Sequence, residues 1–199
     1  MTATTALLAR GRRLEVFTLA WNVIEAIVAG LAGLAAGSTA LIGFGLDSLI
    51  ESLSGGVLLW RLQDGRAGEA RERIAQRLVA MSFVALAGYV TVESVLTLSS
   101  RSEPDASLVG IVLATLSVIV MPILARAKRS VAAGLGSPAL TADSRQTDLC
   151  AYLSAILLVG LGLNALLGWW WADPAAALAM VPIMVYEARR SWRGDSCAC

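Results

Sequence analysis

The chain has 199 residues, of which 57% are hydrophobic and 16% are charged, and its mean hydropathy is +0.69. This composition is too apolar for a water-soluble domain of ordinary surface, so it indicates a protein embedded in a lipid bilayer. The net charge is only +1 and histidine is absent, which removes the commonest proton carrier and metal ligand of proteins from consideration.

Six apolar segments predict six transmembrane helices, because each is near the length of about 20 residues that crosses a hydrocarbon core. In chain order they cover residues 14–36, 39–60, 78–99, 107–125, 139–168 and 174–185. The last segment continues amphipathically towards Trp192. We therefore expect an all-α membrane protein, with residues 1–193 as one six-helix domain and residues 194–199 as a short tail.

The basic residues are divided unevenly between the two sides of the predicted helices. Fifteen of the 16 precede the first segment, follow the sixth, or lie around the second and fourth connections, and only Arg101 lies on the other side. Cytoplasmic loops are enriched in Lys and Arg, so we expect both termini in the cytoplasm, at the inner membrane if the source is bacterial. Three tryptophans at 169–171 predict an interfacial anchor before Asp173 and Pro174, which are typical of a helix start.

A short motif occurs twice in the chain. Residues 37–41 read GSTAL and residues 136–140 read GSPAL, 99 positions later. Because three helices separate the two copies, the motif is expected to begin a helix at opposite membrane faces. This predicts an inverted repeat of three plus three helices, a design that places the substrate site near the midplane between corresponding helices.

Two carboxylates in the second apolar segment mark the candidate site. Asp47 and Glu51 are four residues apart, so they share one face of a helix. The 99-residue offset places Gln146 and Cys150 at the corresponding positions of the fifth segment. An ionisable side chain at the bilayer centre costs about 3 kcal/mol or more, so this pair needs a cation, a proton or a water-filled cavity.

The donor types indicate which ion would bind. Two carboxylates, a thiolate and an amide oxygen suit a tetrahedral, borderline-soft ion such as zinc, whereas magnesium and calcium favour more oxygen ligands. Gln146 is the weakest member, since an amide oxygen is a poor zinc ligand. The alternative is a protonated acidic pair that packs helices, with Cys150 as a small buried hydrophobe. We favour the ion, because the basic residues are all expected near the membrane surfaces, which leaves no intramembrane Lys or Arg to pair with two acids.

The sequence predicts one role for each of Asp143 and Asp148 and leaves two alternatives for the other polar residues. Asp143 is expected at the cytoplasmic mouth of the site, and Asp148 is expected to face another helix in a structural hydrogen bond. Glu25 and Glu93 are each either a proton site that lines a cavity or a neutral packing residue. The Cys-Ala-Cys sequence at 197–199 is either a disordered tail or a weak soft-metal site.

The two motif regions resemble those of the cation diffusion facilitators. Residues 37–51 are similar to the family's helix-two pattern, GSxAL followed by two acidic or histidine ligands four apart. Residues 137–154 are similar to its helix-five pattern, SxALxADxxHxxxDxxxS, with Gln146 and Cys150 where the family usually has His and Asp. Phe44 stands where the family usually has an Asp. The resemblance covers nearly the whole chain, including an Asp-Pro at the start of helix six, but the family's cytoplasmic metal-sensing domain is not expected after residue 193.

The resemblance implies export of zinc or a related divalent ion, commonly in exchange for protons, and a homodimer held by membrane contacts alone. We therefore expect a secondary transporter with a metal site at Asp47, Glu51, Gln146 and Cys150 that works by alternating access. The alternative is a metal-binding membrane protein that regulates or scaffolds a partner without transport. The sequence contains no HExxH, GxSxG or P-loop motif, which counts against a membrane protease or an ATP-driven pump. We expect no enzyme activity, no prosthetic group and no nucleic-acid partner.

Overall fold

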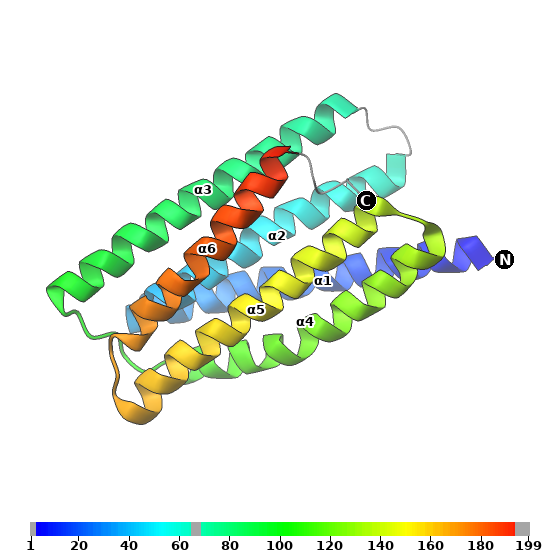
Figure 1. The fold of residues 1–199 in the computed structure, drawn as a ribbon. Helices are drawn as coiled ribbons and strands as arrows, with labels where there is room; N and C mark the ends of the chain where they lie inside the picture. Colours follow the sequence, from blue (N-terminus) through cyan, green and yellow to red (C-terminus); the bar gives the residue numbers. More distant parts are fainter. Residues whose placement is uncertain (1–2, 65–68, 194–199) are drawn as a thin grey trace.

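The computed structural model describes residues 3–64 and 69–193, and within them it contains six α-helices and no β-strand (Figure 1). The helices are α1 (Ala3–Ala36), α2 (Thr39–Asp64), α3 (Glu69–Ser100), α4 (Leu108–Leu135), α5 (Pro138–Leu167) and α6 (Ala172–Arg193). The all-α prediction is confirmed, with one helix for each predicted segment. Arg66 and the tail at 194–199, with its two cysteines, lie outside the described residues.

Several helices run further than the apolar segments that predict them. Helix α1 begins at Ala3 instead of residue 14, and α4 continues to Leu135 instead of ending near residue 125. The predicted helices stop where charged residues begin, after Arg13 and before Arg126. Arg and Lys have high intrinsic helix propensity, so they do not end a helix. The left-handed backbone of Gly136, with φ of 58°, ends α4 instead.

Four of the six helices contain stretches long and apolar enough to cross a membrane, as judged from the described residues. These stretches are Thr5–Ala36, Ala80–Ser100, Leu108–Leu135 and Asp143–Leu167. Their outward faces carry large apolar side chains that no other helix covers, such as Leu34, Leu108 and Leu166. Exposed apolar surface of this extent is compatible with a lipid environment.

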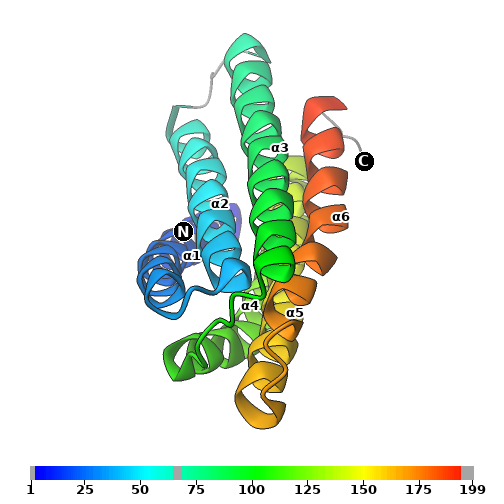
Figure 2. The same ribbon diagram turned by 90° about the vertical axis from the view of Figure 1, so that its left-hand side faces the viewer.

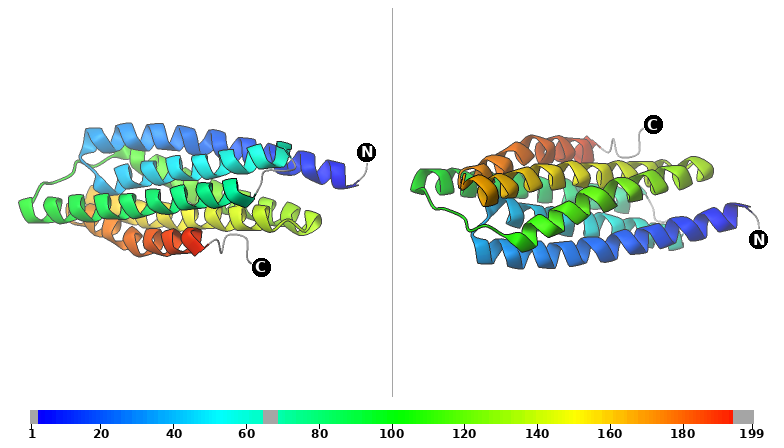
Figure 3. Two further views of the ribbon diagram at one scale, coloured as in Figure 1. Left: turned by 90° about the horizontal axis from the view of Figure 1, so that it is seen from above. Right: turned by 90° about the horizontal axis from the view of Figure 1, so that it is seen from below.

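The helices form a bundle of four with a pair along one side. Helix α1 packs against α2 and α4, α4 packs against α5, and α2 also contacts α5. Helices α3 and α6 pack against each other, and α6 also contacts α5 and α2 (Figures 1 and 2). All six run roughly along the same long axis (Figure 3). Phe44, Met121, Leu157 and Met180 are fully buried where α2, α4, α5 and α6 meet.

Both copies of the repeated motif form the same local structure. Gly37 and Gly136 adopt left-handed backbone conformations, with φ of 64° and 58°, which glycine allows without steric cost. The next residues, Ser38 and Ser137, each accept a hydrogen bond from the backbone amide three positions on, at 3.1 and 3.4 Å. Each serine therefore caps the start of its helix, α2 or α5.

The start of α2 is also tied to the start of α6. Ser38 Oγ donates a hydrogen bond to the Asp173 carboxylate, and the Ala40 amide donates to Asp173 Oδ1 at 3.3 Å. Asp173 lies in the first turn of α6 and is completely buried. Its carboxylate therefore joins the beginnings of two helices that are 133 or more residues apart in sequence.

Further contacts show which helix ends lie together. The Asp105 amide donates to the Ala36 carbonyl at 2.8 Å, and Asn164 Nδ2 donates to the Pro104 carbonyl at 2.9 Å. The end of α5 therefore lies beside the α3–α4 connection, at the end where α1 stops and α2 begins. Helix α5 begins at the opposite end, so the two motif copies cap helices at opposite ends of the bundle.

Candidate metal site

A small buried cavity lies between α2 and α5, with α3 and α6 closing its other sides. All four predicted ligands line it, Asp47 and Glu51 from α2 and Gln146 and Cys150 from α5. The cavity has a volume of about 10 Å³, which is close to the space that one water-sized sphere occupies. The 99-residue alignment thus identifies four residues that share one cavity, although their role as ligands stays a prediction.

The remaining walls are apolar except for one acid that the sequence analysis missed. Phe83 from α3 and Ile183 and Met184 from α6 line the cavity, and so does the carboxylate-bearing residue Glu187. Glu187 is buried and lies 3.7 Å from Arg190 on the same helix. Glu187 is the one acidic residue in the sequence between residues 174 and 194. This isolation was the sequence signal that it could belong to the site.

One carboxylate oxygen of Glu51 accepts a hydrogen bond from a described residue, and the other does not. Its side chain is 4% exposed, and Oε1 accepts a hydrogen bond from Thr147 Oγ1 at 3.3 Å. Oε2 accepts no hydrogen bond from any residue that the structure describes. A buried carboxylate oxygen without a partner is costly, so this atom is available to a cation. Asp47, on the same face of α2, is also 4% exposed.

Cys150 lies between the cavity and another buried acid. The thiol is 1% exposed, and Sγ lies 3.9 Å from Glu25 Oε2. Glu25 itself accepts hydrogen bonds from Ser48 Oγ, at 2.9 Å, and from Ser117 Oγ. Glu25 is absent from the cavity lining, so its hydroxyl partners favour the packing interpretation over a cavity-lining one.

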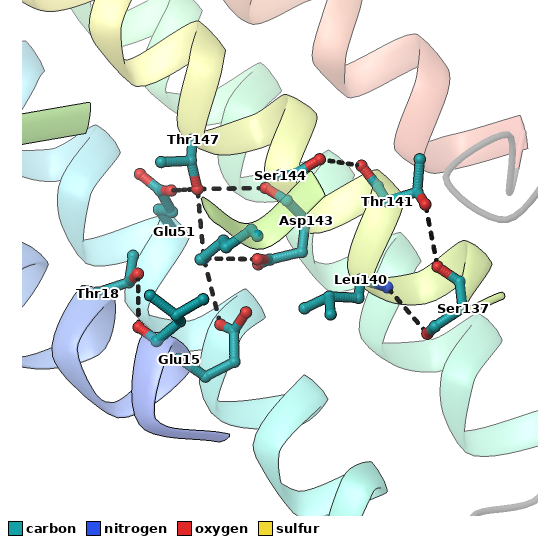
Figure 4. A network of polar contacts seen from close by, with 11 residues as sticks. Glu15, Thr18, Glu51, Ser137, Leu140, Thr141, Asp143, Ser144 and Thr147 are labelled. Atoms are coloured by element: carbon teal, nitrogen blue, oxygen red, sulfur yellow. Dashed lines mark hydrogen bonds and ion pairs between the residues drawn. The ribbon is translucent and has the colours of Figure 1, made fainter. Parts of the chain in front are cut away.

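A buried lysine corrects one premise of the sequence analysis. Lys128 has no exposed side-chain surface, and Nζ lies 3.3 Å from Glu15 Oε2, 2.5 Å from Asp143 Oδ2 and 3.3 Å from Thr147 Oγ1. Figure 4 labels these three partners. The interior therefore does contain a cation that pairs with acids. The premise was wrong because α4 does not end near residue 125, and Lys128 lies one helical turn beyond the buried Ala125.

The two remaining acids of α5 have different surroundings. Asp148 pairs with Arg129 of α4 at the surface, as expected for a structural contact with another helix. Asp143 was expected at the mouth of the site, but it pairs with Lys128 and is absent from the cavity lining. Glu93 in α3 is half-buried and is also absent from the lining.

The side chains that line the cavity are not preassembled as a metal site. Among the residues that the structure describes, no three Cys, Asp or Glu side chains are close enough together to hold one metal ion. Asp47, Glu51 and Cys150 therefore share a cavity without forming a closed ligand set, and their side chains must turn inward to coordinate an ion.

Comparison with known families defines the class of this chain. Residues 16–194 match the family described as the cation efflux transmembrane domain, a range that includes most of α1 and all of the other five helices. The chain belongs to the cation efflux family. This match confirms the resemblance seen in the two motif regions. Members of this family are membrane-embedded transporters of metal cations and not enzymes. No curated protein matches the sequence.

Proposed function

We propose that this cation efflux protein is a secondary transporter of a divalent transition-metal ion, zinc above all, and that the ion binds in the cavity between α2 and α5. The proposed ligands are Asp47, Glu51 and Cys150, with Gln146 beside them. The observation that supports this most directly is the buried cavity lined by these four residues, in which Glu51 Oε2 has no partner in the described structure.

The charges of the site fit a divalent ion. Two carboxylates neutralise its charge, and a thiolate adds the soft donor that zinc and cadmium prefer over magnesium and calcium. Met184 and Glu187 line the same cavity and offer a thioether and a third carboxylate within the apolar wall. Metal ligands must be deprotonated to bind, so binding to Cys150 releases a proton. Proton exchange then requires no histidine.

Access from both membrane faces is the further requirement of a transporter. The two motif copies cap α2 and α5 at opposite ends of the bundle, which supports an inverted repeat with the cavity between the corresponding helices. We propose that the cavity opens alternately to the two faces, that both termini lie on the cytoplasmic side, and that two copies form a homodimer.

The test is uptake of zinc into sealed vesicles that contain the purified protein and an entrapped zinc-sensitive dye. We expect saturable uptake that a pH gradient accelerates and that Asp47→Asn abolishes. Zinc binding without uptake would instead identify a non-transporting metal-binding protein. Absence of both binding and uptake would contradict the proposal.

A further inference from the structure

The Thr147 hydroxyl joins the buried lysine to the candidate site. Thr147 Oγ1 lies 3.3 Å from Lys128 Nζ and 3.3 Å from Glu51 Oε1 (Figure 4). An ammonium group only donates hydrogen bonds, so the hydroxyl accepts from Lys128. Its own hydrogen can go to Glu51 Oε1 or to the Asp143 backbone carbonyl, which lies at 3.2 Å. Lys128 and Glu51 are thus two hydrogen bonds apart.

The position of Lys128 is itself fixed. Its ammonium has three N–H donors, and it has three partners, Glu15 from α1 and Asp143 and Thr147 from α5. With one lysine and two carboxylates, this cluster has a net formal charge of −1. A cation in the neighbouring cavity therefore meets no net positive charge from the cluster.

We propose that Lys128, acting through Thr147, is a positioning residue for the cation site. The Thr147 hydroxyl holds Glu51 Oε1 on the α5 side and leaves Oε2 free to coordinate the ion. This inference rests on the proposed function, since it concerns how Glu51 serves as a ligand. Groups that orient metal ligands commonly contribute about 10-fold or more to metal affinity.

The test replaces the Thr147 hydroxyl without changing the shape of the side chain. We expect Thr147→Val to weaken zinc binding about 10-fold in calorimetry and Thr147→Ser to restore it. Thr91→Val is the matched control, because the Thr91 hydroxyl bonds to the Ala87 carbonyl of its own helix, at 2.7 Å.

Two results would overturn the inference alone, namely wild-type affinity in Thr147→Val, or equal weakening in Thr147→Val and Thr147→Ser. A wild-type protein that binds no zinc would overturn the proposed function and this inference together. The two failures are therefore distinguishable.

A second, independent feature is an outward-facing groove between α3 and α6. It has a volume of about 550 Å³. Its lining residues are of two kinds, which we call the floor and the rim. The floor is the apolar set, which includes Ala80 and Val84 of α3 and Ala188 of α6, and the rim is the set of Arg189, Trp192 and Arg193. The apolar floor fits a hydrocarbon chain, and the rim lies in the last two turns of α6.

The rim has the chemistry of an anion site at a membrane interface. The Arg77 guanidinium lies 5.8 Å from the centre of the Trp192 ring, so a third arginine approaches the same rim. Arg189 and Arg193 are exposed. Basic pockets between transmembrane helices favour the phosphate of anionic lipids. We infer that this groove binds an anionic phospholipid, with an acyl chain along the floor and the headgroup phosphate between the arginines.

Native mass spectrometry with phosphatidylglycerol and phosphatidylcholine tests this second inference. We expect selective retention of phosphatidylglycerol, weakened about fivefold for each arginine removed in Arg189→Gln and Arg193→Gln. The exposed Arg126, on α4, gives the control Arg126→Gln.

Equal retention of both lipids, or no effect of the two rim substitutions, would overturn the lipid site. Displacement of phosphatidylglycerol by inorganic phosphate at equal concentration would also overturn it, because a free anion would then suffice. Efficient crosslinking of Met81→Cys to a second copy would show that another protomer fills the groove.

Discussion

Lys128 Nζ and Asp143 Oδ2 lie 2.5 Å apart inside the helix bundle, with side-chain exposures of 0% and 9%. The contact joins α4 to α5 close to the turn between them, and Glu15 extends it to α1. A buried charge that loses its partner is left without solvent or counter-ion. Removing either residue of this pair is therefore expected to lower the stability of the protein.

We predict that Lys128→Ala destabilises the protein by about 3–5 kcal/mol, because Glu15 and Asp143 lose their shared cation. The measurement is the thermal unfolding midpoint in detergent. Arg129→Ala is the matched control, since the neighbouring Arg129–Asp148 pair is 45% and 28% exposed and is expected to contribute about 1 kcal/mol or less. Equal shifts in the two variants would contradict the buried network.

A second stability prediction concerns the two serine caps. Ser38→Ala removes a helix cap and also the bond to Asp173, whereas Ser137→Ala removes a cap. We expect a loss of about 1 kcal/mol for Ser137→Ala and a loss larger by about 1–2 kcal/mol for Ser38→Ala, because the buried Asp173 carboxylate then loses its side-chain donor and keeps the Ala40 amide. Equal losses would show that the Ser38–Asp173 contact contributes little to stability.

The sequence predicts the fold well where a simple physical rule applies. Apolar length predicts one helix for each segment, and the left-handed glycines before Ser38 and Ser137 explain why the motif begins a helix both times. The same offset brings Asp47, Glu51, Gln146 and Cys150 to one cavity. Internal alignment needs no knowledge of packing, so it works from one sequence.

The parts that the sequence misses depend on packing. Lys128 looks like a loop residue because charge usually marks a membrane boundary, and its burial follows from acids on two other helices. Glu187 lies near basic residues, as surface acids do, and its place in the cavity follows from how α6 packs against α5 and α2. Neither placement is readable from local periodicity.

The orientation in the membrane is predicted from the basic residues alone. Reporter fusions at Asp64 and Glu103 should give opposite answers, with the Asp64 fusion cytoplasmic, because 15 of the 16 basic residues belong to that side. An outward-facing Asp64 fusion would reverse the predicted topology and with it the direction of export.

Cys150 is predicted to bind the ion as a thiolate. Metal then displaces a thiol proton, so zinc and cadmium affinity should fall as the pH falls and proton release should accompany binding. Cys150→Ala should weaken both metals and lose part of the proton release, while Cys150→Asp should restore binding with a preference shifted towards harder ions. Equal affinity and equal proton release in wild type, Cys150→Ala and Cys150→Asp would remove Cys150 from the site.

The central claim, that the cavity between α2 and α5 holds the transported ion, is tested most directly by zinc calorimetry on purified Asp47→Asn and Glu51→Gln. Glu93→Gln is the control, because Glu93 is an acid of a transmembrane helix outside the cavity lining. We predict a loss of at least about 100-fold in affinity for both site variants, with normal membrane expression, and wild-type affinity for the control. Unchanged zinc affinity in both Asp47→Asn and Glu51→Gln would contradict the site.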